Sequence, residues 1–381
     1  MFKSKDLEST SNLLLTNPRW PKDDRFRFQE TWIDLVEGKF EAHVGIATSG
    51  STGGSGSLVL LSKNALRASA RAVNERLAAT SADIWYKSLP NFHVGGLGIL
   101  VRAHLSGAKV VEDESEKWDA TGFHSKLEKS EATLLSLVPT QVFDLVREKL
   151  RSPSRLRAVI VGGGRLEESL RLAALDLGWP ILPSYGMTEA ASQVATAVSP
   201  DDPRLVPLTH LEVMTDHEGR LQLSGSSLLS AKITFDAQGR ATMFDPKRSG
   251  WFTTEDRGEV LEDGSLLIEG RTHDFVKIGG EGVVVSRLEE KLEIAKLHLG
   301  FSKDAAVVAA RDERLGAKMI LLTTANESET KPLAEAYDSG VAPYERIRSI
   351  HTVSAIPRTA LGKLQRGPAL ALVGFEAAAD A

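Results

Sequence analysis

Short apolar runs alternate with helical spacings of apolar residues over residues 44–197. The runs with the length and composition of strands cover 44–48, 58–61, 84–89, 109–112, 133–138, 158–161 and 181–183. Helical spacing is clearest over 66–77, where Ser62 or Asn64 could cap the N-terminus. Further helical patterns cover 96–105, 122–129, 140–150 and 166–177. This alternation predicts an α/β domain built on a wound, mostly parallel sheet.

The pattern changes after residue 200. Short paired strands follow one another up to residue 270 and are joined by turn sequences at 216–219, 236–239 and 262–264. They predict an antiparallel β subdomain over about 205–270. From residue 271 onward, strand and helix patterns predict a small α+β domain. We therefore expect a large domain over 1–270 and a small C-terminal domain over 271–381.

Composition and charge narrow the classes of partner. Of 381 residues, 42% are apolar and 25% are charged, as in an ordinary globular protein. Lys and Arg number 46 against 51 for Asp and Glu, which gives a net charge of −5 without a basic run. We therefore expect neither nucleic acid nor a membrane as a partner. No apolar stretch has the ~18–20 residues of a membrane span, and residues 1–20 lack the apolar core of a signal peptide. A cytoplasmic protein is expected.

Cysteine is absent from the chain. Its absence excludes disulfides, cysteine-ligated zinc, iron–sulfur clusters and a cysteine nucleophile. Any thioester chemistry would therefore need a thiol that is brought in by a ligand.

A loop rich in glycine and hydroxyl residues follows the first predicted strand. Residues 48–57 read Thr-Ser-Gly-Ser-Thr-Gly-Gly-Ser-Gly-Ser. Glycines allow successive backbone N–H groups to face an anion, and hydroxyls add donors, so the loop suits a polyphosphate. A flexible surface loop can have the same composition, and both interpretations stay open on this segment alone.

Four further segments carry side chains that could act on a nucleotide. Residues 184–189, Ser-Tyr-Gly-Met-Thr-Glu, follow a predicted strand and offer a ring for a base, a hydroxyl for phosphate and a carboxylate for Mg²⁺. In the segment 251–258, Asp256 could accept hydrogen bonds from ribose hydroxyls or close an Asx turn. Residues 270–280 span the predicted domain boundary, and residues 357–366 place Lys363 beside a glycine on a terminal loop.

The order of these five segments resembles that of the adenylate-forming superfamily, which includes acyl-CoA synthetases, luciferases and peptide-synthetase adenylation domains. The resemblance covers roughly residues 44–366. It implies an α/β large domain with a β subdomain, and a small mobile C-terminal domain. It also implies ATP, CoA and Mg²⁺ as cosubstrates and cofactor of an AMP-forming acid–CoA ligase. In that reaction a carboxylate and ATP give an acyl-adenylate, from which CoA displaces AMP.

The resemblance assigns roles residue by residue. Lys363 matches the catalytic lysine that contacts the attacking carboxylate and the α-phosphate. Thr188 would donate to the α-phosphate, and Glu189 would hold Mg²⁺. The residues expected to bind the nucleotide are Thr48, Ser49, Gly50, Ser51, Thr52, Gly53, Gly163, Gly164, Tyr185, Gly186, Asp256 and Arg271.

Several of these assignments have an alternative in the residues themselves. Tyr185 and the glycines at 162–164 would form a platform for adenine, although three glycines can also simply end a strand. Arg271 could contact the ribose or a phosphate, or form a salt bridge at the domain boundary. Members of the superfamily rotate the small domain about the segment that corresponds to 270–274, where His273 replaces the usual Asp or Lys. Lys277 would then face the CoA site in place of Lys363.

The acid is expected from a narrower resemblance. Residues 88–96, 135–141 and 191–196 look like those of the o-succinylbenzoate–CoA ligases of menaquinone biosynthesis. The resemblance implies o-succinylbenzoate as the substrate and His93, Thr140 and Gln193 as pocket residues. Another aryl or acyl carboxylate stays open as an alternative, and His93 could also be a turn histidine packed on the sheet edge.

Three departures from the superfamily pattern keep a third possibility open, although the retained Lys363, Glu189 and Asp256 argue against it. The phosphate loop lacks the usual Pro-Lys near its end, so one cation near the β- and γ-phosphates is missing, and Lys63 cannot be assumed to replace it. Glu255 stands where glycine is usual, and the chain ahead of the loop is short, so we expect the large domain to lack a layer. A catalytically impaired nucleotide-binding homologue is therefore also compatible with the sequence.

Overall fold

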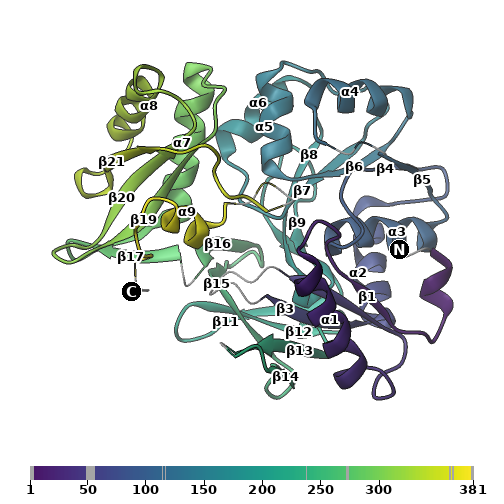
Figure 1. Cartoon of the computed structure of the whole chain (residues 1–381). Helices are drawn as coiled ribbons and strands as arrows, with labels where there is room; N and C mark the ends of the chain where they lie inside the picture. The colour runs from purple at the N-terminus through teal and green to yellow at the C-terminus, as the bar shows by residue number, and fades with distance from the viewer. Residues whose placement is uncertain are drawn as a thin grey trace. The chain divides into compact units, whose positions relative to one another are not determined.

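The computed structural model describes residues 4–48, 56–113, 115, 117–236, 238–271, 274–359, 362 and 364–378. Figure 1 shows the course of the chain, which divides into two compact units. The first unit comprises Met1–Thr254 and Glu259–Leu267, and the second comprises Glu255–Gly258 and Ile268–Ala381.

A seven-stranded sheet organises the first unit in the order β10-β9-β8-β7-β6-β4-β5. Its strands are β4 (Ile84–Lys87), β5 (Lys109–Glu112), β6 (Leu134–Leu137), β7 (Ala158–Val161), β8 (Ile181–Met187), β9 (Ser192–Thr196) and β10 (Val206–Pro207). The strands β5, β4, β6, β7 and β8 pair in parallel, whereas β9 and β10 run antiparallel to their neighbours. The predicted wound, mostly parallel sheet is confirmed.

Four helices connect the parallel strands of this sheet, namely α3 (Val94–Ser106), α4 (Ala120–Lys129), α5 (Pro139–Arg147) and α6 (Glu168–Asp176). A further helix, α2 (Lys63–Leu77), precedes β4 in the chain. The strands β6 and β7 are buried along their whole length, as expected where helices cover both faces of a sheet. The helix α2 packs against α3, and α5 packs against both α4 and α6. Of the two predicted caps of α2, Ser62 is the observed one, since its hydroxyl accepts from the N–H of Ala65 at 3.0 Å.

A second sheet of the first unit has the order β1-β2-β3-β13-β14. It contains β1 (Leu13–Leu15), β2 (His43–Thr48), β3 (Ser57–Ser62), β13 (Ala231–Phe235) and β14 (Ala241–Phe244). The assignment of 44–48 and 58–61 to the wound sheet was wrong, because β2 and β3 pair antiparallel in this separate sheet. Fully buried strands of either sheet type read as the same apolar runs, so the sequence pattern could not distinguish the two sheets.

The helix α1 (Lys22–Leu35) packs on this second sheet, and a short 3-10 turn, η1 (Ser4–Glu8), precedes it in the chain. Phe28 and Trp32 of α1 share a buried cluster with Leu58 and Leu60 of β3. The packing against β2 is close, since a Cβ on Gly45 would lie 2.2 Å from Cζ3 of Trp32. Position 45 therefore requires glycine for α1 to lie against the strand that leads into the loop 49–56.

The predicted turns all join consecutive strands. The third sheet has the order β11-β12-β15-β16, with β11 (Leu211–Thr215), β12 (Arg220–Gly225), β15 (Phe252–Val260) and β16 (Leu266–Arg271). In the turn between β11 and β12, the carboxylate of Asp216 accepts from the N–H groups of Glu218 and Arg220, each at 2.9 Å. The turn sequence at 236–239 lies between β13 and β14, which belong to the second sheet and not to the third, since β14 pairs with β13 and β13 pairs with β3.

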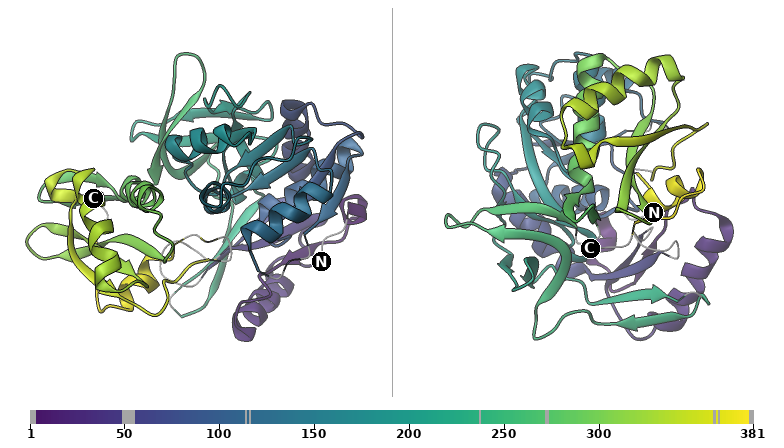
Figure 2. Two further views of the ribbon diagram at one scale, coloured as in Figure 1. Left: turned by 90° about the horizontal axis from the view of Figure 1, so that it is seen from above. Right: turned by 90° about the vertical axis from the view of Figure 1, so that its left-hand side faces the viewer.

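The second unit is a small α+β body, as predicted. Its sheet has the order β18-β17-β20-β19, and β21 pairs in parallel with β20. The strands are β17 (Phe275–Ile278), β18 (Glu281–Val284), β19 (Ala305–Asp312), β20 (Gly316–Thr323) and β21 (Ile347–Thr352). The helices are α7 (Val285–Leu299), α8 (Glu327–Ser339) and α9 (Arg366–Ala371), with a 3-10 turn η4 (Pro343–Glu345). Figure 2 shows these elements from two further directions.

The period-two alternation of β19 separates two small cores in this unit. Val307 and Ala309 belong to the cluster that includes residues of α7 and α8, whereas Val308 and Ala310 belong to the cluster that includes Leu370 of α9. Both faces of the sheet are therefore covered, which explains why β19 is a continuous apolar run in the sequence.

The longest helices with described bounds, α2 and α7, have 15 residues each. A bilayer needs about 20 predominantly apolar residues in a helix that spans it. Within the described segments, no helix is long and apolar enough to cross a membrane.

Candidate active site

The carboxyl ends of β6, β7 and β8 bring three predicted segments together. A Cβ on Gly162, just after β7, would lie 3.2 Å from the carbonyl oxygen of Ser184 in β8. A Cβ on Gly164 would lie 3.6 Å from Pro139, the residue before Thr140 at the start of α5. Thr140, Gly163, Gly164 and Tyr185 therefore lie along one edge of the sheet. In open α/β sheets this edge is where ligands bind.

Two glycines of this edge have backbone reasons for their identity. Gly163 has a φ of +79°, which side chains with a Cβ rarely adopt. Gly186 lies at an irregularity in the pairing of β8 with β9, and a Cβ there would lie 2.0 Å from the carbonyl oxygen of Ser192. Tyr185 on β8 is half-buried, and the adjacent bulge sets the direction in which the chain leaves the strand.

Replacing Gly186 by alanine should lower the free energy of unfolding by about 1–3 kcal/mol, since the new methyl group must push two backbone segments apart. Urea unfolding measures the effect. Gly367→Ala is the matched control, because no heavy atom lies within 4 Å of a Cβ there. A Gly186→Ala protein as stable as the control would show that the chain at β8 and β9 is not held as tightly as the structure places it.

Glu189 is held in the turn that follows β8. Thr188 and Glu189 lie in a short 3-10 helix, η2 (Thr188–Ala190), which ends at Ala191 with a φ of +54°. The backbone carbonyl of Glu189 accepts from the N–H of Leu229 at 2.8 Å, and its carboxylate accepts from Lys232 at 3.1 Å. The backbone contact fixes the turn, so the carboxylate is presented from a defined position.

The donor set around Glu189 fits Mg²⁺ bound through a substrate. Among the described residues, no group of three or more His, Asp or Glu could hold a metal ion by itself. Mg²⁺ typically keeps waters and binds through one or two carboxylates together with substrate phosphates. A single carboxylate on η2 agrees with that mode and not with a dedicated protein cage.

The stem of the predicted phosphate loop is described up to Thr48. Thr48 ends β2, and its hydroxyl lies 2.8 Å from the hydroxyl of Ser57, the first residue of β3. The two strands therefore hold the ends of the loop together by both backbone and side-chain contacts. The predicted residues Ser49, Gly50, Ser51, Thr52 and Gly53 lie outside the described residues.

Of the predicted site residues that the structure describes, three belong to the second unit. The guanidinium Nε of Arg271 lies 3.4 Å from a carboxylate oxygen of Asp256, so the two candidate ribose contacts are neighbours. The N–H of Arg271 also donates to Asp274 at 3.3 Å. Lys277 is exposed on β17. Lys363 and His273 lie outside the described residues, so their roles stay predictions.

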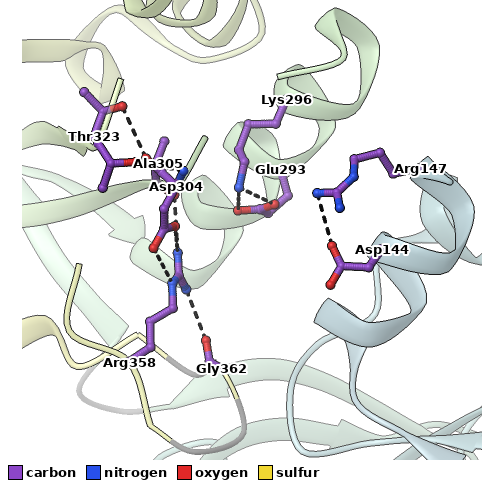
Figure 3. A network of polar contacts seen from close by, with 10 residues as sticks. Asp144, Arg147, Glu293, Lys296, Asp304, Ala305, Thr323, Arg358 and Gly362 are labelled. Atoms are coloured by element: carbon purple, nitrogen blue, oxygen red, sulfur yellow. Dashed lines mark hydrogen bonds and ion pairs between the residues drawn. The ribbon is translucent and has the colours of Figure 1, made fainter. Parts of the chain in front are cut away.

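Arg358 anchors the described part of the loop around position 363 (Figure 3). Its guanidinium forms an ion pair with Asp304 at 2.7 Å and donates to the carbonyl of Gly362 at 3.1 Å. The N–H of Gln365 donates to the carbonyl of Pro357 at 2.9 Å, which closes the loop at its base. Sequence reasoning did not single out Arg358, although it stands directly after Pro357 in the motif.

One of the predicted pocket residues, Gln193, contacts a buried arginine that sequence reasoning also missed. His93 precedes α3 as its N-cap residue, and Arg102 lies in the last turns of the same helix. The Arg102 side chain is 2% exposed and donates to the hydroxyl of Ser192 on β9 at 3.0 Å. Its Cζ lies 5.8 Å from the ring centroid of Trp85, within cation–π range.

Gln193 is the second partner of this guanidinium. In the amide orientation that satisfies both of its ends, the Gln193 oxygen accepts from Arg102 at 3.0 and 3.2 Å, and the nitrogen donates to Ser184 at 3.3 Å. Burial lowers the pKa of Arg102 to about 10, so the group keeps its charge at neutral pH. Among the described residues its partners are neutral, and Nε has none. The sequence contains one indication of this buried charge, because Arg102 is the single charged residue in the apolar run 97–103.

A buried cation with neutral partners is an unusual arrangement, because proteins generally pair buried charges. It favours an anionic ligand group that completes the site. The positive charge of Arg102 also acts on His210. Burial is the largest cause that lowers the pKa of His210 to about 4, and repulsion by Arg102 is the second. Burial alone lowers the pKa of His93 to about 4. Both imidazoles are therefore neutral at pH 7.

These two histidines predict a loss of stability in mild acid. In the unfolded chain they titrate near pH 6.5, so between about pH 6.5 and 4 the unfolded state binds more protons than the folded state. The free energy of unfolding therefore falls as the pH falls through this range, by about 2 kcal/mol per histidine between pH 7.5 and 5.0. Urea unfolding at the two pH values measures the loss. The His93→Gln/His210→Gln variant should lose less, and an equal loss in both proteins would contradict the assignment.

With this geometry in place, comparison with known proteins identifies the class. Residues 42–226 match the family model described as AMP-binding enzyme. This segment carries the seven-stranded sheet, Thr48, the glycines after β7 and the Tyr-Gly-Met-Thr-Glu turn. Over this segment, which is just under half of the chain, the protein is similar to the AMP-binding enzyme family, and the chain has the two-domain adenylate-forming fold.

Particular relatives are similar at lower identity. A 2-succinylbenzoate–CoA ligase of Bacillus pumilus is 28% identical over 299 residues, which are 74% of this chain and 60% of that protein. The chain thus spans less than two thirds of that relative's length. The corresponding ligase of Bacillus cytotoxicus is 29% identical over 86% of this chain and 69% of that protein. The solved o-succinylbenzoate CoA synthetase of Bacillus subtilis, in complex with its acyl-adenylate intermediate, superposes with a TM-score of 0.72 at 22% identity. The superposition covers 96% of this chain and 80% of the solved chain.

Proposed function

We propose that this protein is an ATP-dependent, AMP-forming acid–CoA ligase that acts on o-succinylbenzoate. The observation that carries the proposal is the meeting of Thr140, the glycines after β7 and Tyr185 at one sheet edge, inside the segment that is similar to the AMP-binding enzyme family. The names of the relatives supply the acid. Such a ligase would serve menaquinone biosynthesis, as its relatives' reaction implies.

The first half-reaction is proposed to take place at this edge. A carboxylate oxygen attacks the α-phosphorus of ATP, the bond to the bridging oxygen breaks, and pyrophosphate leaves with the electron pair. Glu189 would hold Mg²⁺, which neutralises phosphate charge when bound. Thr188 would donate to the α-phosphate, and Lys363 would neutralise the charge that develops on its oxygens. Positioning and charge stabilisation are the main contributions that a protein makes to such a step.

The second half-reaction consumes the acyl-adenylate. The sulfur of CoA attacks the acyl carbon, AMP leaves, and the thiol proton passes to solvent. The chain has no cysteine, so CoA is the source of the sulfur in the product. We propose that Lys277 lines the CoA side of the site during this step and that the small domain rotates between the two steps.

The acid pocket is proposed to include His93, Thr140, Gln193 and Arg102. The neutral imidazole of His93 suits an uncharged part of the substrate. The buried guanidinium of Arg102 suits a carboxylate that does not react. A dicarboxylate such as o-succinylbenzoate provides both a carboxylate for adenylation and a second one for Arg102.

The proposal is tested by incubating the protein with ATP, Mg²⁺, CoA and a panel of carboxylic acids, followed by mass spectrometry. We expect the mass of o-succinylbenzoyl-CoA, and pyrophosphate release that depends on that acid. A thioester with a different aryl or acyl acid would replace the proposed substrate but keep the reaction. ATP binding without pyrophosphate release for any acid would instead support an impaired nucleotide-binding homologue.

A further inference from the structure

The phosphate loop of this chain lacks a cation of its own. Residues 48–57 contain no lysine or arginine, and the next lysine in the chain is Lys63. Lys63 is 1% exposed, and its ammonium donates to the carbonyls of Asp6 and Ser9 at 2.5 and 2.8 Å and to the hydroxyl of Ser9 at 2.9 Å. These contacts use all three N–H donors of the ammonium. They also hold Lys63 at the end of β3 that is opposite to the loop. Lys63 therefore cannot replace the missing cation.

Lys232 approaches the same region from the neighbouring strand. On β13, Thr234 pairs with Ser57 at the loop end of β3, and Lys232 pairs with Val59. Positions 232 and 234 lie on the same face of β13, because side chains alternate along a strand. The ammonium of Lys232 lies 3.1 Å from the carboxylate of Glu189, the candidate Mg²⁺ ligand, and the two side chains are 23% and 19% exposed. Among the ion pairs that the described residues form, this is the one made by Glu189.

We propose that Lys232 supplies the missing cation and binds the β- and γ-phosphates of ATP beside Glu189. This inference rests on the proposed function, since it concerns the same nucleotide site. Two opposite charges meet here at the border of solvent, where an ion pair by itself contributes little to stability. Lysine is a point charge on a flexible stem of four carbons, so its ammonium can turn from a carboxylate to a phosphate without moving the backbone. When Mg²⁺ takes the carboxylate of Glu189, the phosphates become the nearest anions for Lys232.

The experiment compares the binding of ATP and AMP to the purified full-length protein by isothermal titration calorimetry in the presence of Mg²⁺. In Lys232→Met, the dissociation constant of ATP should rise about 10- to 100-fold, as expected for a lost charge-assisted hydrogen bond. The dissociation constant of AMP should change less than about 3-fold, because AMP has no β- or γ-phosphate. Lys232→Arg, which keeps the charge, should restore most of the ATP affinity.

Lys318→Met is the matched control. The side chain of Lys318 is 27% exposed, similar to that of Lys232, and it lies 3.6 Å from the carboxylate of Asp312, which is outside the candidate site, so ATP affinity should stay near that of the unchanged protein. Lys232→Gln is a second variant in case the methionine protein folds poorly.

Two results would overturn the inference. The first is unchanged ATP affinity in both Lys232→Met and Lys232→Gln. The second is an equal loss of affinity for ATP and AMP, which would indicate a structural role. Failure of the proposed function gives a different result. In that case the unchanged protein forms no thioester with any acid, while the comparison of ATP with AMP still decides the role of Lys232.

Discussion

Acyl-adenylate formation is expected to slow about 10²–10³-fold in Lys363→Ala, because a preorganised charge at the reacting phosphorus is lost. The lysine is expected to contact both the attacking carboxylate and the α-phosphate, so its removal affects the attack more than the binding of either substrate. The rate of pyrophosphate release in a single turnover measures this step. The second half-reaction, started from supplied acyl-adenylate and CoA, should be much less affected, since Lys363 is expected to leave the site before it.

The comparison of the two half-reactions is the decisive part of this experiment. A variant that merely folds poorly loses both, and Lys331→Ala, on the exposed surface of α8, controls for the loss of a lysine from the same unit. Equal damage to both half-reactions in Lys363→Ala, with the control unaffected, would contradict the proposed division of labour between Lys363 and Lys277.

Arg102→Met should raise the KM for o-succinylbenzoate about 30-fold or more, because removing one partner of a buried charge pair costs about 2–5 kcal/mol. This rise in KM is expected only for an acid that carries the second, non-reacting carboxylate. An analogue in which the non-reacting carboxylate is a carboxamide should be used poorly by the unchanged protein and about equally poorly by the variant. Steady-state thioester formation over a range of acid concentrations measures both values.

Arg102 is nearly completely buried, so the fold must be tested alongside the activity. Methionine has a similar length and removes a buried charge, a kind of replacement that is often neutral for stability. Urea unfolding of the variant checks this point, and Arg102→Lys tests the charge without the bidentate geometry. Equal loss of activity with both the acid and its carboxamide analogue would show that Arg102 supports the fold and does not recognise the carboxylate.

The fold was predictable where a pattern had one structural meaning. The spacing over 66–77 predicted α2, with Ser62 as one of two possible caps, and the turn sequence at 216–219 predicted a hairpin. The sheet membership of β2 was not predictable, because a buried antiparallel strand and a buried parallel strand give the same apolar run. Pairing between β3 and β13 joins residues that are far apart in sequence, and local patterns hold no information on such partners.

The residues of the candidate site also fall into those that one continuous motif predicts and those that depend on neighbours from other elements. That Tyr185, Gly186 and Glu189 lie close together was predictable, since they stand in one continuous motif that runs from β8 into η2, and their roles stay predictions. Arg102 and Lys232 were missed because their significance depends on neighbours from other elements, Ser192 in one case and Glu189 in the other. A single charged residue inside the apolar run 97–103 was a usable signal for Arg102. For Lys232, the only signal was indirect, namely a loop without its usual lysine.

The close approach of Gly45 to Trp32 reaches beyond the packing of α1. Thr48 lies three residues further along the same strand, so a side chain at position 45 that forces the indole aside would also shift the start of the loop. In a survey of random variants, substitutions at position 45 are therefore expected to weaken ATP binding, although Gly45 is not among the proposed binding residues. The contact with the indole ring couples a position outside the proposed ATP site to the loop.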